Sequence, residues 1–143
     1  MKTKLLLLII TIIAIASYAF QINEPWTRKQ LMEPAVLANI LNNPAEKQPI
    51  LFSIGPGGGI KSSLDIGQTK EKENIEKLRK QLNNLSRDTM IVIYCGCCPF
   101  KDCPNIRPAF QLLNEMKFTN TRLLDLSKNL KADWIDKGYP INN

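Results

Sequence analysis

Histidine is absent from this sequence of 143 residues, and cysteine is scarce, with four residues in the whole chain. Without histidine the chain cannot form a Ser-His-Asp triad, a Cys-His protease pair or a zinc site with histidine ligands. Four cysteines are also too few for a small domain held together by several disulfides. All four nevertheless lie between Cys95 and Cys103. Such a concentration is typical of a site rather than of a scaffold.

The first nineteen residues have the pattern of a secretory signal peptide. A short basic start precedes an apolar segment, Leu5 to Ala16, and residues 17–19 offer small side chains where signal peptidase requires them. This segment is shorter than the roughly 18 to 20 residues that cross a bilayer, so cleavage is favoured over retention as an anchor. The sequence therefore predicts a signal peptide over residues 1–19, export to the periplasm or cell envelope, and one domain over residues 20–143.

The predicted mature chain is mildly basic, because its 124 residues include 17 lysines and arginines and 13 acids. The basic residues are spread along the chain and do not form the clusters with interleaved aromatics that are typical of nucleic-acid binding. We therefore expect no nucleic-acid partner and, after leader cleavage, no membrane partner. In an exported protein, cysteines tend to be oxidised unless a reducing partner or a metal protects them.

Strand and helix patterns alternate along the chain. The predicted strands cover residues 49–54, 64–67, 90–94 and 122–126, and the predicted helices cover residues 33–41, 70–85, 104–116 and 129–137. The run 90–94 is continuously apolar, as in a strand buried on both faces of a parallel sheet. The glycines of residues 55–59 lack the spacing of a phosphate loop and are predicted to form a turn. The alternation predicts a single α/β domain with a mainly parallel sheet.

The cysteine segment begins where the strand 90–94 ends. Ligand sites of open α/β sheets lie beyond the carboxyl ends of strands, against the start of the next helix. Cys95 is placed there, and the helix N-terminus together with Lys101 and Arg107 is expected to favour its thiolate. Cys95 is therefore the predicted nucleophile or sulfur carrier, and the first cysteine expected to be alkylated after mild reduction. Taken alone, it also fits an ordinary buried core residue.

Two runs of the sequence resemble the rhodanese family. Ile-Val-Ile-Tyr-Cys at residues 91–95, followed by a loop and an arginine-containing helix start, is similar to the active-site half of a rhodanese domain. Asp-Trp-Ile-Asp-Lys-Gly-Tyr-Pro at residues 133–140 is similar to that family's tryptophan helix and terminal Gly-Tyr-Pro. The resemblance covers about residues 30–141. It implies a rhodanese-like three-layer α/β fold, in which helices flank a mainly parallel central sheet.

The resemblance also implies an activity. By position Cys95 would accept sulfane sulfur as a persulfide held by backbone N–H groups, which needs neither histidine nor a cofactor. The predicted function is sulfurtransferase chemistry or thiol-disulfide exchange, with a small anionic sulfur compound or a protein thiol as partner. The loop from Cys95 to Arg107 spans thirteen residues and is longer than the family's. Arg107 and Lys101 are the residues predicted to position the substrate.

The three further thiols leave several interpretations open. Cys97 and Cys98 are adjacent, with Cα atoms about 3.8 Å apart across a trans peptide, so a disulfide between them would be strained. Cys103 can approach the other cysteines more easily and is the favoured resolving or bridging thiol, with Cys97 and Cys98 as further redox candidates. A structural disulfide in an inactive rhodanese fold is another possibility.

The alternative function is metal or partner binding by a non-catalytic envelope protein. Cys95, Cys97, Cys98 and Cys103 could together hold Cu(I) or an iron–sulfur centre, since these metals favour soft thiolates. Their spacing differs from the two separate Cys-x-x-Cys pairs of a structural zinc site.

Overall fold

The computed structural model describes residues 24–142 of the chain. The predicted signal peptide, residues 1–19, lies outside the described residues, so its cleavage and the export of the protein stay predictions. Between residues 24 and 142, the chain contains no helix that is both long and apolar enough to cross a membrane.

The middle layer of the domain is a five-stranded sheet in the order β1-β5-β4-β2-β3. Its strands are β1 (Leu31–Met32), β2 (Ile50–Ser53), β3 (Leu64–Asp65), β4 (Ile91–Tyr94) and β5 (Thr121–Leu124). Each described pair of neighbouring strands is parallel, and β4 lies at the centre with all four residues buried. The predicted parallel sheet is therefore confirmed. The edge strand β1 was not predicted, because two residues carry too little pattern to be recognised.

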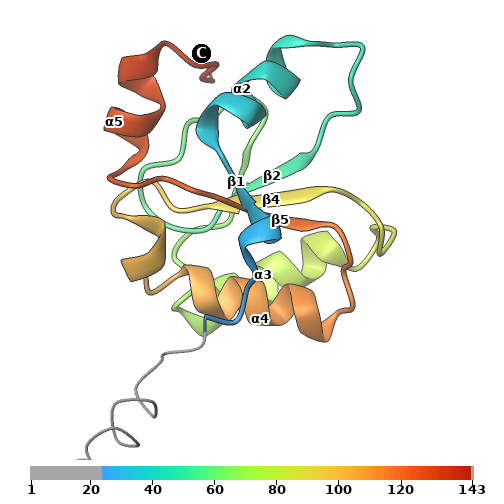
Figure 1. Cartoon of the computed structure of the whole chain (residues 1–143). Helices are drawn as coiled ribbons and strands as arrows, with labels where there is room; N and C mark the ends of the chain where they lie inside the picture. Colours follow the sequence, from blue (N-terminus) through green and yellow to red (C-terminus); the bar gives the residue numbers. More distant parts are fainter. Residues whose placement is uncertain (1–23, 143) are drawn as a thin grey trace, which may run out of the picture.

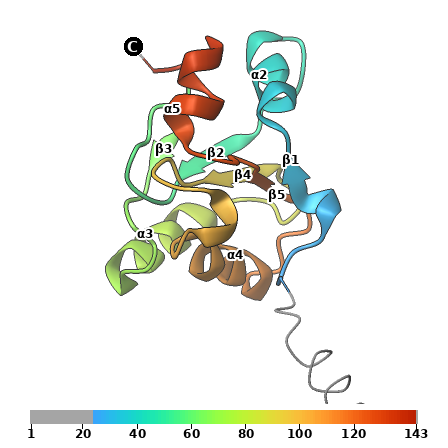
Figure 2. The ribbon, with the colours of Figure 1, turned by 60° about the vertical axis from the view of Figure 1, so that its left-hand side comes forward.

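Helices cover both faces of this sheet, which confirms the three-layer α/β architecture. Figures 1 and 2 show α2 (Pro34–Asn42) and α5 (Leu130–Asp133) on one face, and α3 (Lys72–Leu82) and α4 (Ile106–Glu115) on the other. Three short 3-10 turns complete the described chain: η1 (Arg28–Gln30), η2 (Phe100–Asp102) and η3 (Ile135–Lys137). The predicted last helix is split into α5 and η3 at Trp134, whose backbone leaves the helical region.

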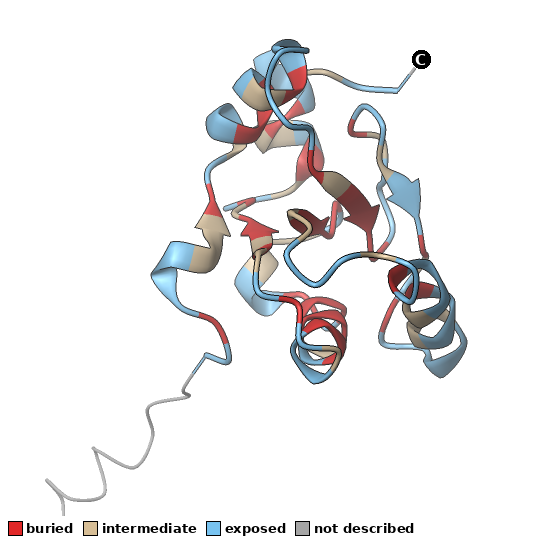
Figure 3. Ribbon diagram, turned by 90° about the vertical axis from the view of Figure 1, so that its right-hand side faces the viewer, coloured by how far each residue is buried: buried red, intermediate tan, exposed pale blue. Residues whose placement is uncertain are grey.

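The central strand distributes its side chains between two cores. Ile91 and Ile93 pack on the side of α3 and α4, whereas Val92 and Tyr94 pack on the side of α2 and α5. This follows from the two-residue period of a strand, and Figure 3 shows the buried residues gathered in the sheet and on the inner helix faces. Cys95, the next residue, lies in the same core as Ile93. The alternation therefore places the Cys95 thiol on the α4 side of the sheet.

Candidate functional site

The four cysteines come together at the carboxyl end of β4. Their Sγ atoms all lie within 4.8 Å of one another, and all four thiols are free. The Sγ atoms of Cys95 and Cys97 are 3.5 Å apart, and those of Cys97 and Cys98 are 3.2 Å apart. The structure thus gathers every cysteine that the sequence singled out into a single cluster, here called the thiol cluster.

The loop after β4 turns back on itself to bring Cys103 beside Cys95. Two backbone hydrogen bonds, each of 3.0 Å, hold the loop in place. Phe100 N–H donates to the Leu126 carbonyl just after β5, and the Gly96 carbonyl accepts from Leu130 N–H at the start of α5. The turn η2 then reverses the chain, and Cys103 N–H closes it by donating to the Phe100 carbonyl at 3.2 Å.

Burial divides the thiol cluster into an inner and an outer pair. Cys95 and Cys103 are 1% and 3% exposed, whereas Cys98 is half-buried and Cys97 is exposed. A reagent arriving from solvent therefore meets Cys97 and Cys98 before it reaches the inner pair.

Glycines form the wall of the site opposite the cysteines. A Cβ atom on Gly55 would overlap the Cys95 Sγ, and one on Gly96 would overlap the carbonyl oxygen of Gly57. Gly57 itself has φ +81°, a left-handed conformation that favours glycine. In the structure the segment 55–59 is a bend at Gly55 and Pro56 followed by irregular backbone, and it lies directly against the cysteine loop. The sequence did hold a signal for this contact. The glycine segment follows β2 and the cysteine loop follows β4, and neighbouring parallel strands end at the same edge of the sheet.

Asn105 is the polar residue that connects the inner thiols to the rest of the fold. It is 2% exposed, and its Nδ2 donates to the Sγ atoms of Cys95 and Cys103, each at 3.7 Å. Its Oδ1 accepts from Lys70 N–H at 3.0 Å, and its backbone oxygen accepts from the Thr69 hydroxyl at 2.6 Å. Sequence reasoning missed this residue: an asparagine directly before a helix suggests a cap, whereas the Asn105 side chain makes no cap hydrogen bond and contacts the sulfurs instead.

The electrostatics of the cluster favour a thiolate at Cys103. The hydrogen bond from the Cys95 thiol, with further ones from the Asn105 N–H, the Cys98 thiol and the Asn105 side chain, lowers the pKa of Cys103 to about 5 against the effect of burial. Conversely, the hydrogen bond to Cys103 and burial raise the pKa of Cys95 well above its ordinary value. Burial and the Cys97 thiol raise the pKa of Cys98 to about 12.

The directions of these pKa shifts differ from the expectation of a thiolate at Cys95, since they favour the thiolate at Cys103, and the role of Cys95 as nucleophile stays a prediction. The helix α4 begins only at Ile106, so Cys103, three residues earlier, occupies the position near its N-terminus. The loop extension separates Cys95 from that helix along the chain. Cys95 is buried whereas Cys97 is exposed, so the expectation that Cys95 is alkylated first stays a prediction that the burial does not favour.

Arg107 and Lys101, the residues predicted to position the substrate, take different places. A nitrogen of the Arg107 guanidinium lies 2.8 Å from a Glu24 carboxylate oxygen, and the group stacks 5.1 Å from the centre of the Trp26 ring. Lys101 is exposed on η2. The Arg107 side chain thus contacts the segment before β1. The role of Arg107 and Lys101 in binding substrate stays a prediction.

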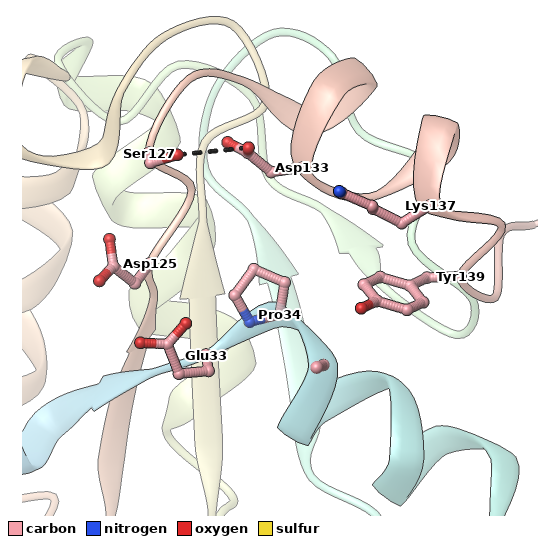
Figure 4. Close-up of a pocket in the computed structure, with 8 residues that line it drawn as sticks. Glu33, Pro34, Asp125, Ser127, Asp133, Lys137 and Tyr139 are labelled. Atoms are coloured by element: carbon pink, nitrogen blue, oxygen red, sulfur yellow. Dashed lines mark hydrogen bonds between the residues drawn. The ribbon is translucent and has the colours of Figure 1, made fainter.

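A separate hollow of about 400 Å³ lies between the start of α2 and the segment from β5 to η3 (Figure 4). It is lined by Glu33, Pro34, Ala35, Asp125, Ser127, Asp133, Lys137 and Tyr139. Burial, followed by the neighbouring Glu33 and Asp133 carboxylates, raises the pKa of Asp125. Since this crowding of acids disfavours an anionic ligand, the thiol cluster is the better candidate for sulfur chemistry.

No known family model matches this chain, and no curated protein does. The parallel α/β sheet and the cysteine cluster are compatible with a rhodanese-like fold.

Replacing Asn105 with alanine should destabilise the protein by about 1–3 kcal/mol. The substitution removes the donor to two buried sulfurs and the half-buried bond from Lys70 N–H, and lost hydrogen bonds of buried groups cost about this much. Chemical denaturation measures the change. Asn114→Ala, on the exposed side of α4, is the matched control and should stay within about 0.5 kcal/mol of the wild type. Equal stability of the two variants would contradict the role of Asn105.

Proposed function

We propose that this protein is an exported rhodanese-like protein that transfers sulfane sulfur, or exchanges thiols and disulfides, through Cys95. The observation that carries the proposal is the inner pair. Two buried thiols share the Asn105 amide at the carboxyl end of the central parallel strand, where α/β folds place their ligand sites. The motifs of residues 91–95 and 133–140, which resemble the rhodanese family, support the same chemistry.

The first step loads sulfur onto Cys95. The Cys95 proton passes to the Cys103 thiolate, whose sulfur lies within 4.8 Å of the Cys95 sulfur. The Cys95 thiolate attacks the outer sulfur of thiosulfate, the sulfur–sulfur bond of the donor breaks, and sulfite leaves with the bonding electron pair. The product is the Cys95 persulfide anion. The total charge is unchanged, and no further oxidant or reductant is required.

The second step removes the sulfur in one of two ways. An external thiolate can take the outer sulfur, which returns Cys95 as a thiolate. Alternatively, Cys103 returns its proton to the outer sulfur of the persulfide, and the resulting Cys103 thiolate attacks the inner sulfur, forms a Cys95–Cys103 disulfide and releases hydrosulfide. The mutual distance of at most 4.8 Å between the sulfurs supports this resolving role for Cys103. The outer thiols, Cys97 and Cys98, connect the inner pair to the surface, where a protein thiol can act as acceptor.

Intact-mass spectrometry tests the proposal. Reduced protein incubated with thiosulfate, or with a small-molecule persulfide, should gain the mass of one sulfur atom, and a reductant should remove it. Resolution by Cys103 should instead appear as a loss of two hydrogens, which is also reversed by reductant. Protein that keeps its reduced mass with both donors would refute the proposed chemistry.

A further inference from the structure

We further infer that Cys95, Cys97, Cys98 and Cys103 form a closed four-thiolate site for one zinc-type divalent ion, which blocks Cys95 when it is bound. The metal site is independent of the proposed function, and only the blocking effect rests on it.

The positions of the sulfur atoms suit a single ion. With metal–sulfur bonds of about 2.3 Å, the ligands of a tetrahedral ion lie about 3.8 Å apart. The four Sγ atoms lie within 4.8 Å of one another, and two of their separations are 3.5 and 3.2 Å. Shifts of a few tenths of an ångström to about 1 Å would give the tetrahedral arrangement. A cluster of several irons places its thiolates on different metal atoms and therefore farther apart, so it fits less well.

The surroundings of the site also suit a divalent cation. Four thiolates crowded at this spacing need positive charge, and of the two cations of this segment Arg107 is paired with Glu24 and Lys101 is exposed to solvent. Zn²⁺ leaves a smaller net negative charge than Cu(I) on the same four ligands, which matters because Cys95 and Cys103 are buried. The Asn105 amide already donates to both inner sulfurs, as outer hydrogen-bond partners of metal ligands do.

Such a site has no room for a fifth ligand from the glycine side. A Cβ on Gly55 would overlap Cys95 Sγ, and the Gly57 carbonyl lies against Gly96, so the backbone closes the cluster there. Four thiolate ligands also leave no open coordination position, as in structural rather than catalytic zinc sites. The metal would therefore hold the loop and protect its thiols from oxidation. It would also prevent attack by Cys95, whose sulfur electron pair is engaged in the metal bond.

The sequence spacing argued against zinc because it lacks two separate Cys-x-x-Cys pairs. In the structure the chain reverses at η2 and returns Cys103 to the end of β4. The fourth ligand therefore comes from the same loop, and a second Cys-x-x-Cys pair is not needed. Loop folding, rather than spacing, thus creates the ligand set.

Cobalt titration of the reduced, metal-free full-length protein tests the site without reference to activity. We expect one equivalent of Co²⁺ to bind with the intense visible absorption of tetrahedral cobalt and a thiolate-to-cobalt charge-transfer band. Zn²⁺ should then displace it. Cys97→Ser alters an exposed ligand that the fold does not need, and it should weaken binding at least tenfold. Asp102→Asn, an exposed change in the same loop, should bind Co²⁺ within about twofold of the wild type.

Several results would overturn the inference. These are no uptake of Co²⁺ or Zn²⁺, cobalt absorption without the thiolate band, or equal affinity of Cys97→Ser and wild type. The blocking effect has its own test, because zinc-loaded protein should gain no sulfur from thiosulfate under conditions in which the metal-free protein does. Equal sulfur gain by both forms would remove that effect. Cobalt binding by a protein that never gains sulfur would support the metal site and refute the proposed function. Sulfur gain by a protein that binds no cobalt would support the proposed function and refute the metal site.

Discussion

Replacing Cys95 with serine should abolish sulfur transfer, lowering its rate on the order of 10³-fold or more. A serine hydroxyl stays protonated near neutral pH and cannot form a persulfide, whereas its size lets it occupy the buried position beside Asn105. Transfer from thiosulfate to a thiol acceptor measures the rate, and intact mass measures the loaded sulfur. The variant should keep its reduced mass throughout.

Two companion variants separate the roles of the other thiols. Cys103→Ser should still gain one sulfur at Cys95 but should never lose two hydrogens, because the resolving thiolate is missing. Loading should also be slower, since Cys103 no longer takes the Cys95 proton. Cys97→Ser, at the exposed end of the cluster, should keep both reactions. If Cys95→Ser gains sulfur as fast as the wild type, Cys95 has no part in the mechanism.

Replacing Gly96 with alanine should destabilise the protein by about 3 kcal/mol, at the upper end of the usual cost of overpacking. The added Cβ would overlap the carbonyl oxygen of Gly57. This neighbour is backbone and cannot rotate away as a side chain would, so one of the two loops must move. Because Gly96 also accepts the hydrogen bond from Leu130 N–H, the displacement should spread to the start of α5. Chemical denaturation measures the loss of stability.

Gly138→Ala is the comparison variant, because it replaces a glycine without a steric overlap. A Cβ at Gly138 meets no atom within 4 Å, but its φ of +70° is left-handed. Alanine there should cost about 1 kcal/mol and leave the thiols untouched. Gly96→Ala should in addition expose Cys95 to alkylation, which mass spectrometry of the labelled peptides detects. A Gly96→Ala protein as stable as Gly138→Ala, with Cys95 still protected, would disprove the close contact of the two loops.

The main elements of the fold could be predicted because their patterns are local. The apolar run 90–94 and the helical spacing of residues 70–85 each report burial within one segment, and both elements are present with shorter ends. The edge strand β1 depends on a distant partner, because among the described strands it pairs with β5, and that partner is not visible in the local sequence. The segment after the break at Trp134 is held by a nearer contact, since the Trp134 indole N–H donates to the Pro140 carbonyl at 2.9 Å.

By itself the sequence determined the α/β fold and the place of the thiols. The chain has no histidine, and its cysteines are confined to Cys95–Cys103, directly after a buried strand. Only the tertiary structure decided how the sulfurs meet. A thiol pKa depends on neighbours in space, and the folded loop brings Cys103 and Asn105 beside Cys95, lowers the pKa of Cys103 and sets the glycine segment 55–59 against the Cys95 sulfur. The order of these residues along the chain could not reveal the arrangement, because the turn η2 folds the loop back on itself.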